Sequence, residues 1–282
     1  MRRAGCTGNA ELPGFRRTIT GVWRYNAGMP LPPIQFDREI PLFPLPNCVL
    51  FPGVVQPLHI FEPRYRSMMA DTLQDQSAIA MVLLKPGWEK NYYSSPAIYE
   101  MACVGRIVAH EALPDGKYNL LLQGVTRARV IADRPRAGDA GVEAGVYRVA
   151  LLEAQADVRG NETAACQVQR RVIKELFEKT ALKDLTVTPA LAELFEEDLA
   201  GASLENADGM TGLPTSRLID VLAFSLVQDV AVKQRLLEER DPAVRGELLL
   251  RELVALAARL GAGVRAGGRA ADGSWPPTLG VN

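Results

Sequence analysis

The sequence predicts an α+β protein in which a strand-rich half precedes a helical half. Between residues 39 and 155, short apolar runs alternate with turn residues, which is typical of strands. Between residues 161 and 260, apolar side chains recur every three or four positions, as in amphipathic helices. Because strands and helices are segregated along the chain, we expect an α+β fold or two subdomains.

The composition is that of a globular protein. Hydrophobic residues make up 48% of the 282 residues, and the formal net charge is -1. This charge gives no overall attraction to nucleic acid or to an acidic membrane, so neither partner is expected. No apolar run reaches the roughly 18 residues of a membrane helix. No apolar segment follows Arg2 and Arg3, as a secretory signal requires, so a cytoplasmic location is expected.

The two ends differ from the rest of the chain. Residues 1–38 are predicted to be a disordered or mis-assigned extension, because the first part is polar and without periodicity. Met29 is an alternative start, and the sequence leaves open whether the chain begins at Met1 or Met29. Residues 261–282 are rich in Gly, Ala, Arg and Pro, which predicts a disordered tail.

Prolines and apolar runs set the elements of the strand-rich half. Prolines argue against a central strand through 40–53, so we expect a short extended piece at 40–44 and a loop at 45–53. The strand expected at 54–61 is apolar on both faces, which predicts burial on both sides. The remaining expected elements are a helix at 63–74, a strand at 78–84, a loop at 85–96, strands at 101–113 and 117–132 around a Pro114-Asp115-Gly116 turn, and a strand at 142–154.

Helical periodicity and capping residues set the second half. Asp241 and Pro242 suit the start of the last helix, and Gly261 is predicted to end it. The segments 215–227 and 229–239 form either two helices or one bent helix. The other expected helices are 162–180 and 189–199, and a loop is expected at 201–214.

No motif for catalysis, a cofactor or a metal is found. The only Gly-Lys pair, at 116–117, lies in the predicted turn and not in a phosphate-binding loop. No C-x-x-C pair occurs, so we expect four reduced thiols and no metal site. Cys103 and His110 are about 23 Å apart along one strand and cannot meet there. Cys48 and His59 could approach each other across the fold.

Two groups of side chains are candidates for binding. The aromatic residues Phe51, Trp88, Tyr92 and Tyr93 stand in the two predicted loops, where aromatics often anchor partners; alternatively, they cover the end of the sheet. Thr126, Arg127 and Arg129 could bind an anion, although such arginines more often cover the outer face of a sheet. The acidic residues at 193 and 196–198 fit a solvated helix face.

Two blocks resemble the N-terminal, substrate-binding domain of Lon proteases. The first is IPLFPLPNCVLFPGVVQPLHIFEPRYRSMM at 40–69, similar to the pattern "lPLfPL…vlfPg…pL.ifE.ry". The second is VGRIVAHEALPDGKYNLLLQGVTRARV at 104–130, with Gly105, Asp115, Gly116, Gly124 and Arg127 at matching places. The helical half is more weakly similar, so the resemblance covers residues 39–260.

The resemblance implies a fold and a function. The fold would be a PUA-like bent sheet or partial barrel of about six strands, at 39–155, followed by a helical bundle at 161–260. The chain would be a free-standing, bacterial-type form without the ATPase and peptidase domains. It would recognise unfolded or degradation-prone polypeptides without catalysis, with a protease as a further partner. The alternatives are an ATP-dependent protease component and an RNA-binding PUA-like module.

Overall fold

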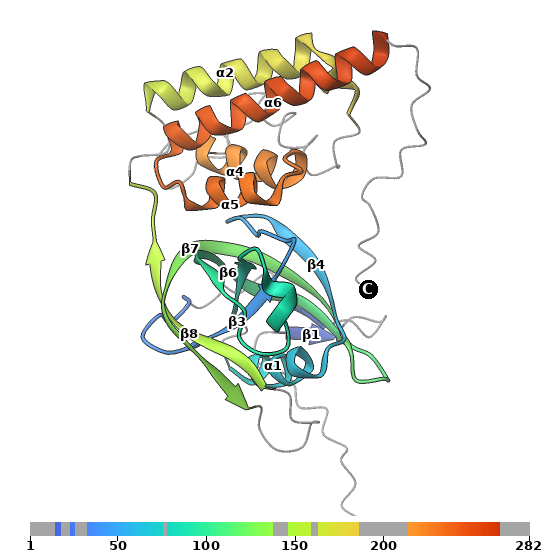
Figure 1. Cartoon of the computed structure of the whole chain (residues 1–282), viewed down its shortest axis with the longest axis vertical. Helices are drawn as coiled ribbons and strands as arrows, with labels where there is room; N and C mark the ends of the chain where they lie inside the picture. Colours follow the sequence, from blue (N-terminus) through green and yellow to red (C-terminus); the bar gives the residue numbers. More distant parts are fainter. Residues whose placement is uncertain are drawn as a thin grey trace, which may run out of the picture.

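A computed structural model of the chain describes residues 33–75, 78–137, 146–158, 163–185 and 214–265, and the backbone of 15–17 and 23–25. The strands gather at one end of the molecule and the late helices at the other (Figure 1). The expected α+β class and the order of strands before helices are confirmed. The expected helix at 189–199, the acidic residues on it and the tail beyond 265 lie outside the described residues.

The strands form one strongly bent sheet. Its order is β1-β2-β6-β5-β3-β8-β7-β4, and β6 also pairs with β7, which bends the sheet back on itself. The expected partial barrel of about six strands is therefore confirmed by β3 to β8. The strands are β1 (Phe15–Arg17), β2 (Trp23–Tyr25), β3 (Ile40–Leu45), β4 (Val55–Ile60), β5 (Ala78–Leu84), β6 (Ile98–Ala112), β7 (Tyr118–Ala137) and β8 (Val146–Gln155).

The strands β1 and β2 lie within the segment 1–38, for which the sequence predicted no regular structure. They pair with each other, and Trp23 of β2 pairs with His110 of β6. The pairing partner is distant in sequence, so periodicity within the segment could not reveal it. The division of the chain into domains at residues 38, 155 and 260 remains a prediction.

Strand β3 differs from expectation because it is a central strand. It pairs with β5 on one side and β8 on the other, although it contains Pro41 and Pro44. The two ladders overlap only at Leu42, since β8 pairs with Ile40–Leu42 and β5 with Leu42–Leu45. Each proline therefore lies beside a single neighbouring strand, where one missing N–H can be tolerated.

Strand β4 was wrongly predicted to be buried on both sides. Val55, Pro57 and His59 are exposed, whereas Gln56 and Ile60 on the other face are buried. Among the described strands β4 pairs with β7 alone and ends the strand order, as an edge strand containing a proline should. The prediction took the apolar residues of the outer face as evidence of burial, but no described element covers that face of an edge strand.

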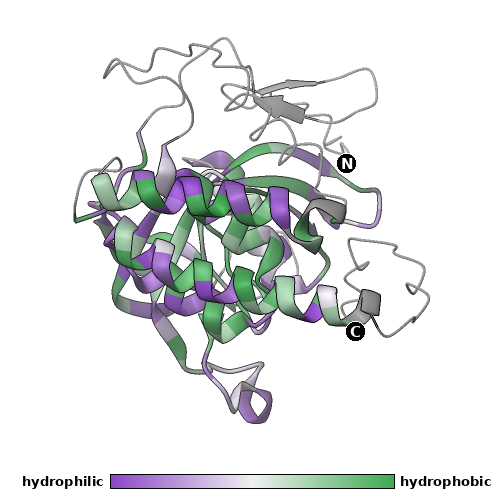
Figure 2. Cartoon of the chain, turned by 90° about the horizontal axis from the view of Figure 1, so that it is seen from above, coloured by the Kyte–Doolittle hydropathy of each residue, from purple (hydrophilic) through white to green (hydrophobic). Residues whose placement is uncertain are grey.

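The helices agree closely with the sequence pattern. The described helices are α1 (Pro63–Gln74), η1 (Trp88–Asn91), α2 (Ala164–Lys179), η2 (Ala181–Asp184), α4 (Thr215–Leu226), α5 (Val230–Glu238) and α6 (Pro242–Arg265). Asp241 caps α6, because its Oδ1 accepts from the Ala243 N–H at 3.0 Å. Helix α6 does not end at Gly261 but continues to Arg265. Green and purple alternate along the helices (Figure 2), as expected where one face is buried.

One hydrophobic core runs through both halves of the molecule. It contains Phe43 and Met81 from the sheet, Met68 from α1, and Leu236 and Leu249 from the late helices. A second, smaller cluster lies within the sheet alone and consists mostly of Ala, Val, Ile and Leu side chains from β3, β5, β6, β7 and β8. The shared core places the helices directly on the sheet, so the halves form one packed unit.

Candidate functional site

Three of the four predicted aromatic residues lie together in the loop 85–96, called the aromatic loop below. The Trp88 and Tyr92 ring centroids are 5.3 Å apart and those of Tyr92 and Tyr93 are 5.1 Å apart, both edge to face. Tyr93 is 88% exposed, whereas Trp88 and Tyr92 are half-buried. The result is a row of aromatic side chains whose outermost ring faces solvent.

Phe51, the fourth candidate, is not part of this row. Its side chain is fully buried in the main core. The segment that carries it is closed against β7 by paired backbone bonds, Gly53 N–H to Gly124 O at 2.7 Å and Gly124 N–H to Val54 O at 2.8 Å. Phe51 therefore supports the fold and presents no surface to a partner.

Arg64 at the start of α1 holds the aromatic loop from one side. Its Nη1 donates to the Tyr92 backbone oxygen at 3.0 Å, and its Nε donates to Glu62 Oε2, also at 3.0 Å. The guanidinium carbon lies 4.5 Å from the ring centroids of both Tyr65 and Tyr92. The Tyr92 hydroxyl in turn donates to Glu62 Oε1 at 2.8 Å. Tyr92 is thus fixed at its backbone, ring face and hydroxyl.

The electrostatics of this cluster follow from its partial burial. Burial first, and then the hydrogen bond to Glu62, raise the pKa of Tyr92 to about 12. Burial lowers the pKa of Arg64, but Tyr65, Glu62 and Tyr92 outweigh it, and the net effect raises that pKa. Arg64 therefore stays charged and Tyr92 stays protonated at any physiological pH.

Arg148 of β8 holds the other end of the aromatic loop. Its Nη1 donates to the Pro96 backbone oxygen at 2.7 Å, and its Nε donates to Asp133 Oδ2 at 2.8 Å. Arg64, Tyr92, Pro96 and Arg148 line a common cavity of only about 30 Å³. This volume suits ordered water and is too small for a side chain.

No role was predicted from the sequence for Glu62, Arg64, Asp133 or Arg148, called the loop anchors below. A signal existed for two of them, because Glu62 and Arg64 stand in the quoted pattern "ifE.ry". Their contact with a loop 28 residues further on could not be read from the sequence. Asp133 and Arg148 lie in strands where charged residues are unremarkable, and no sequence signal marked them.

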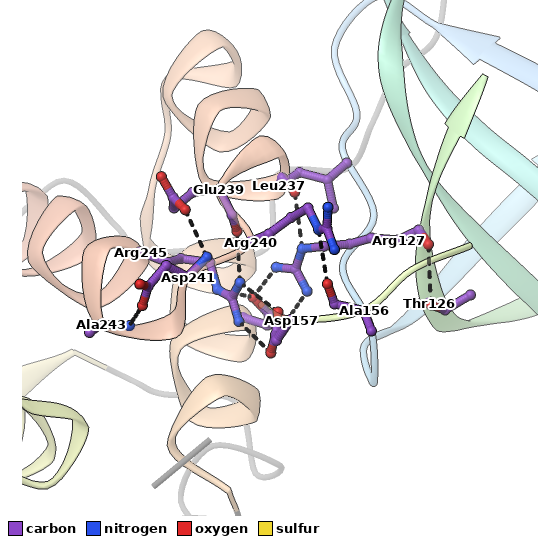
Figure 3. A network of polar contacts seen from close by, with 11 residues as sticks. Thr126, Arg127, Ala156, Asp157, Leu237, Glu239, Arg240, Asp241, Ala243 and Arg245 are labelled. Atoms are coloured by element: carbon purple, nitrogen blue, oxygen red, sulfur yellow. Dashed lines mark hydrogen bonds and ion pairs between the residues drawn. The ribbon is translucent and has the colours of Figure 1, made fainter. Parts of the chain in front are cut away.

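A second arginine cluster, the arginine seam, joins the sheet to the helices (Figure 3). It consists of Arg127, Asp220, Arg245 and Asp157. Arg127 donates to both oxygens of Asp220, at 2.9 and 2.6 Å, and from Nε to the Leu237 backbone oxygen at 3.0 Å. Arg245 pairs with Asp220 at 3.1 Å and with Asp157 at 3.1 and 3.2 Å.

The arginine seam decides the role of Arg127. Both Arg127 and Asp220 are buried, and Asp220 raises the pKa of Arg127 against the opposing effect of burial. Neither expectation for Arg127 holds, since it neither covers the outer sheet face nor is available to an anion. Arg129 does lie on the outer face, where it pairs with Glu153 at 2.6 Å.

Comparison with known proteins identifies the family. The family model described as the ATP-dependent protease La (LON) substrate-binding domain matches residues 39–255. The chain belongs to this family. It is 26% identical over 211 residues to the Lon protease of Rickettsia conorii and 25% identical over 245 residues to Lon protease 2 of Myxococcus xanthus. These alignments cover 74% and 83% of this chain but only 25% and 27% of the relatives, so the chain spans about a quarter of their length.

Solved structures are also similar to this Lon substrate-binding domain. The Lon N-terminal domain protein from Xanthomonas campestris is 23% identical, with a TM-score of 0.45, covering 76% of this chain and 98% of that one. The N-terminal domain of the Mycobacterium avium complex Lon protease is 16% identical, with a TM-score of 0.49, covering 77% and 98%.

The cysteine and histidine candidates of this Lon substrate-binding domain have other surroundings. Burial raises the pKa of the Cys48 thiol to about 11, although the positive charge of Lys233 acts to lower it. His59 instead shares a 2.8 Å hydrogen bond with Asn119. Burial also raises the pKa of Cys103 and lowers that of His110 to about 4.

The described part of the domain holds neither a metal-ligand group nor a helix suited to cross a membrane. Within it, no group of three or more His, Cys, Asp or Glu residues is arranged to hold a metal ion. Among the helices of the same part, none is both long and apolar enough to cross a membrane. Cys48, Cys103 and Cys166 are free thiols there.

Proposed function

We propose that the chain is a non-catalytic module of the cytoplasm that recognises unfolded or degradation-prone polypeptides for Lon-type proteolysis. The observation that carries this proposal is the aromatic loop. Tyr93 is 88% exposed at the end of a packed row with Tyr92 and Trp88. A monomeric fold gains little from leaving such a ring in water, whereas a binding surface uses it.

Aromatic side chains suit the recognition of varied polypeptides. They offer a large contact area and lose few torsions on binding, so they contribute affinity at a low entropic cost. The loop is also held at Tyr92 and Pro96 before any partner arrives. A surface ordered in advance binds more tightly than one that must become ordered on contact.

A binding role agrees with the state of the described nucleophile candidates. A cysteine attacks as the thiolate, so a reactive cysteine has a lowered pKa. Here burial raises the pKa of both Cys48 and Cys103. The surface arginines Arg129 and Arg134 pair with Glu153 and Glu39, so neither offers an unpaired positive charge to a nucleic acid.

The family assignment supports the kind of partner. The matched model carries the description "substrate-binding domain", and the curated relatives are Lon proteases. Polypeptides destined for degradation, and a protease that degrades them, are therefore the partners that we propose.

The test is binding of a stably unfolded protein, reduced and carboxymethylated lactalbumin, measured by fluorescence anisotropy with the full chain. Replacing Tyr93 with alanine should weaken binding about tenfold, since a central aromatic anchor contributes more than 1 kcal/mol. The control is Val168→Ala, which removes an exposed apolar side chain of α2 and should leave affinity unchanged.

Equal affinity of the wild type and Tyr93→Ala would refute the proposed site. Hydrolysis of the same unfolded protein by the purified chain with ATP would refute the non-catalytic role. Binding of single-stranded RNA in preference to the unfolded protein would favour the RNA-binding alternative.

A further inference from the structure

We infer that Arg64 and Arg148 are positioning residues that hold the aromatic loop in its binding conformation and make its recognition insensitive to charge. This inference rests on the proposed function, and it assigns a role to residues outside the aromatic row. The two arginines come from α1 and β8, which are far apart in sequence, yet they line the same small cavity beneath the loop.

The two arginines make the same set of contacts. Each pairs with a carboxylate, Arg64 with Glu62 at 2.9 Å and Arg148 with Asp133 at 2.7 Å. Each also donates to one backbone oxygen of the loop, at Tyr92 and at Pro96 respectively. The residues between these two points, 93 to 95, are exposed. The loop is therefore fixed immediately before and after the segment that carries Tyr93.

The loop's other hydrogen bonds include the Tyr92 hydroxyl to Glu62, Lys85 N–H to Ala97 O at its base and Ser94 N–H to Asn91 O within it, and they are joined by little apolar burial. Its short helix η1 buries no residue, and the side chains of residues 85–95 are exposed or half-buried. Ordering backbone residues costs conformational entropy. With little apolar burial to offset this cost, the hydrogen bonds from Arg64 and Arg148 decide how much of the time the loop is in place.

The anchors also set the charge of the binding surface. The positive charges of Arg64 and Arg148 are matched by the negative charges of Glu62 and Asp133. The two ion pairs therefore add no net charge to the surface around Tyr93, and the exposed Glu89 and Lys90 of the loop are opposite in sign. The ligand class that fits is an apolar or aromatic polypeptide segment, bound with little dependence on salt.

The first readout is trypsin cleavage after Lys90, an exposed residue of η1, followed by mass spectrometry of the native full chain. Cleavage requires the loop to open, so its rate reports the open fraction. Arg64→Met and Arg148→Met should each raise this rate about fivefold. The matched control is Arg129→Met, which breaks an exposed pair with Glu153 elsewhere on the sheet and should leave the rate unchanged.

The second readout is the affinity for carboxymethylated lactalbumin. The Arg64→Met and Arg148→Met variants should bind about fivefold more weakly, as expected if the competent loop is less populated. Wild-type affinity should change less than about twofold when NaCl rises from about 0.05 to about 0.5 M. Wild-type rates of cleavage in both variants would overturn the positioning role, and a steep loss of affinity with salt would overturn the charge-neutral surface.

Two further variants keep the tests separate. If Arg64→Met does not fold, Arg148→Met carries the test, and an unchanged rate of cleavage after Lys90 in that variant overturns the inference. Tyr92→Phe, which removes only the hydroxyl bond to Glu62, should also speed cleavage after Lys90. Tyr93→Ala distinguishes the two proposals, because it should lose affinity without any change in cleavage. If Tyr93→Ala binds normally while the arginine variants are cleaved faster, the positioning role stands and the proposed binding surface fails.

Discussion

The arginine seam and the loop anchors both consist of arginine–carboxylate pairs, but the pairs differ in how far they are buried. In the seam, the side chains of Arg127 and Asp220 are 4% and 3% exposed, whereas those of Arg64 and Glu62 in the loop anchors are 16% and 18% exposed. Buried ions cannot return to water when a partner is lost, but ions near the surface can. The seam should therefore determine whether the molecule folds, and the anchors should determine only where one loop lies.

The positions of the two clusters agree with this difference. The arginine seam lies where the sheet meets α4, α5 and α6, next to the core that runs through both halves. The loop anchors lie beneath a segment whose short helix buries nothing. If the aromatic loop is the recognition site that we propose, stability and recognition are carried by separate parts of the domain, and each can be changed without the other.

The largest expected effect comes from breaking the seam at its central carboxylate. Asp220 pairs with both Arg127 and Arg245, so Asp220→Ala leaves two buried guanidinium groups with a single remaining carboxylate, Asp157. We expect the free energy of unfolding to fall by about 3 to 5 kcal/mol. Urea denaturation followed by circular dichroism measures this change.

A compensated variant distinguishes lost pairing from lost packing. Replacing Arg127 with Met and Asp220 with Leu together leaves only one buried guanidinium in the seam, that of Arg245, which keeps its pair with Asp157. The apolar replacements also keep volume, so part of the lost stability should return. If Asp220→Ala costs less than about 1 kcal/mol, the seam is no more important than a surface ion pair and the comparison with the loop anchors fails.

The sequence predicted local features well and long-range ones poorly. Helix α1 and strand β5 have the predicted bounds, because periodicity, Pro63 and the adjacent polar residues act within a few positions. The Pro-Asp-Gly turn is also confirmed, with Gly116 at φ 77. By contrast, Arg127 and Asp220 are 93 residues apart and only the fold brings them together. The edge position of β4 and the burial of Phe51 depend on topology in the same way.

The next largest effect concerns the glycines. A Cβ on Gly124 would lie 2.1 Å from the Phe51 backbone oxygen, and a backbone atom cannot move aside as a flexible side chain can. Gly124→Ala should therefore lower the free energy of unfolding by about 2 to 3 kcal/mol, since it forces apart the contact between β7 and the segment carrying Phe51. Thermal denaturation measures the difference.

Gly261 provides the opposite control for the same substitution. It lies inside α6, and a Cβ there would meet no atom within 4 Å. Gly261→Ala should therefore stabilise the chain by up to about 1 kcal/mol, because alanine loses less backbone freedom in a helix. Equal effects of the two substitutions would mean that close contact at Gly124 does not constrain the sheet.

A moderate effect is expected from acid. Burial lowers the pKa of His110, in β6, to about 4, from an ordinary value of 6.5. Below pH 6.5 the unfolded chain binds a proton that the folded chain does not, so stability falls until the pH reaches about 4. Allowing for partial solvent screening, the loss should be about 2 kcal/mol. Denaturation of wild type and His110→Gln at several pH values measures it, and an equal loss in both would exclude His110 as the cause.

The smallest effect on stability belongs to the loop. Tyr92→Phe removes the 2.8 Å hydrogen bond to Glu62 and keeps the ring against Arg64, so it should cost about 1 kcal/mol or less. The same variant should nevertheless be cleaved faster after Lys90, because the open and closed loop differ by only a few contacts. A small loss of stability together with faster cleavage after Lys90 is what distinguishes the loop anchors from the arginine seam. A loss of stability comparable to that of Asp220→Ala would place the loop within the cooperative core, and recognition could then not be altered independently of folding.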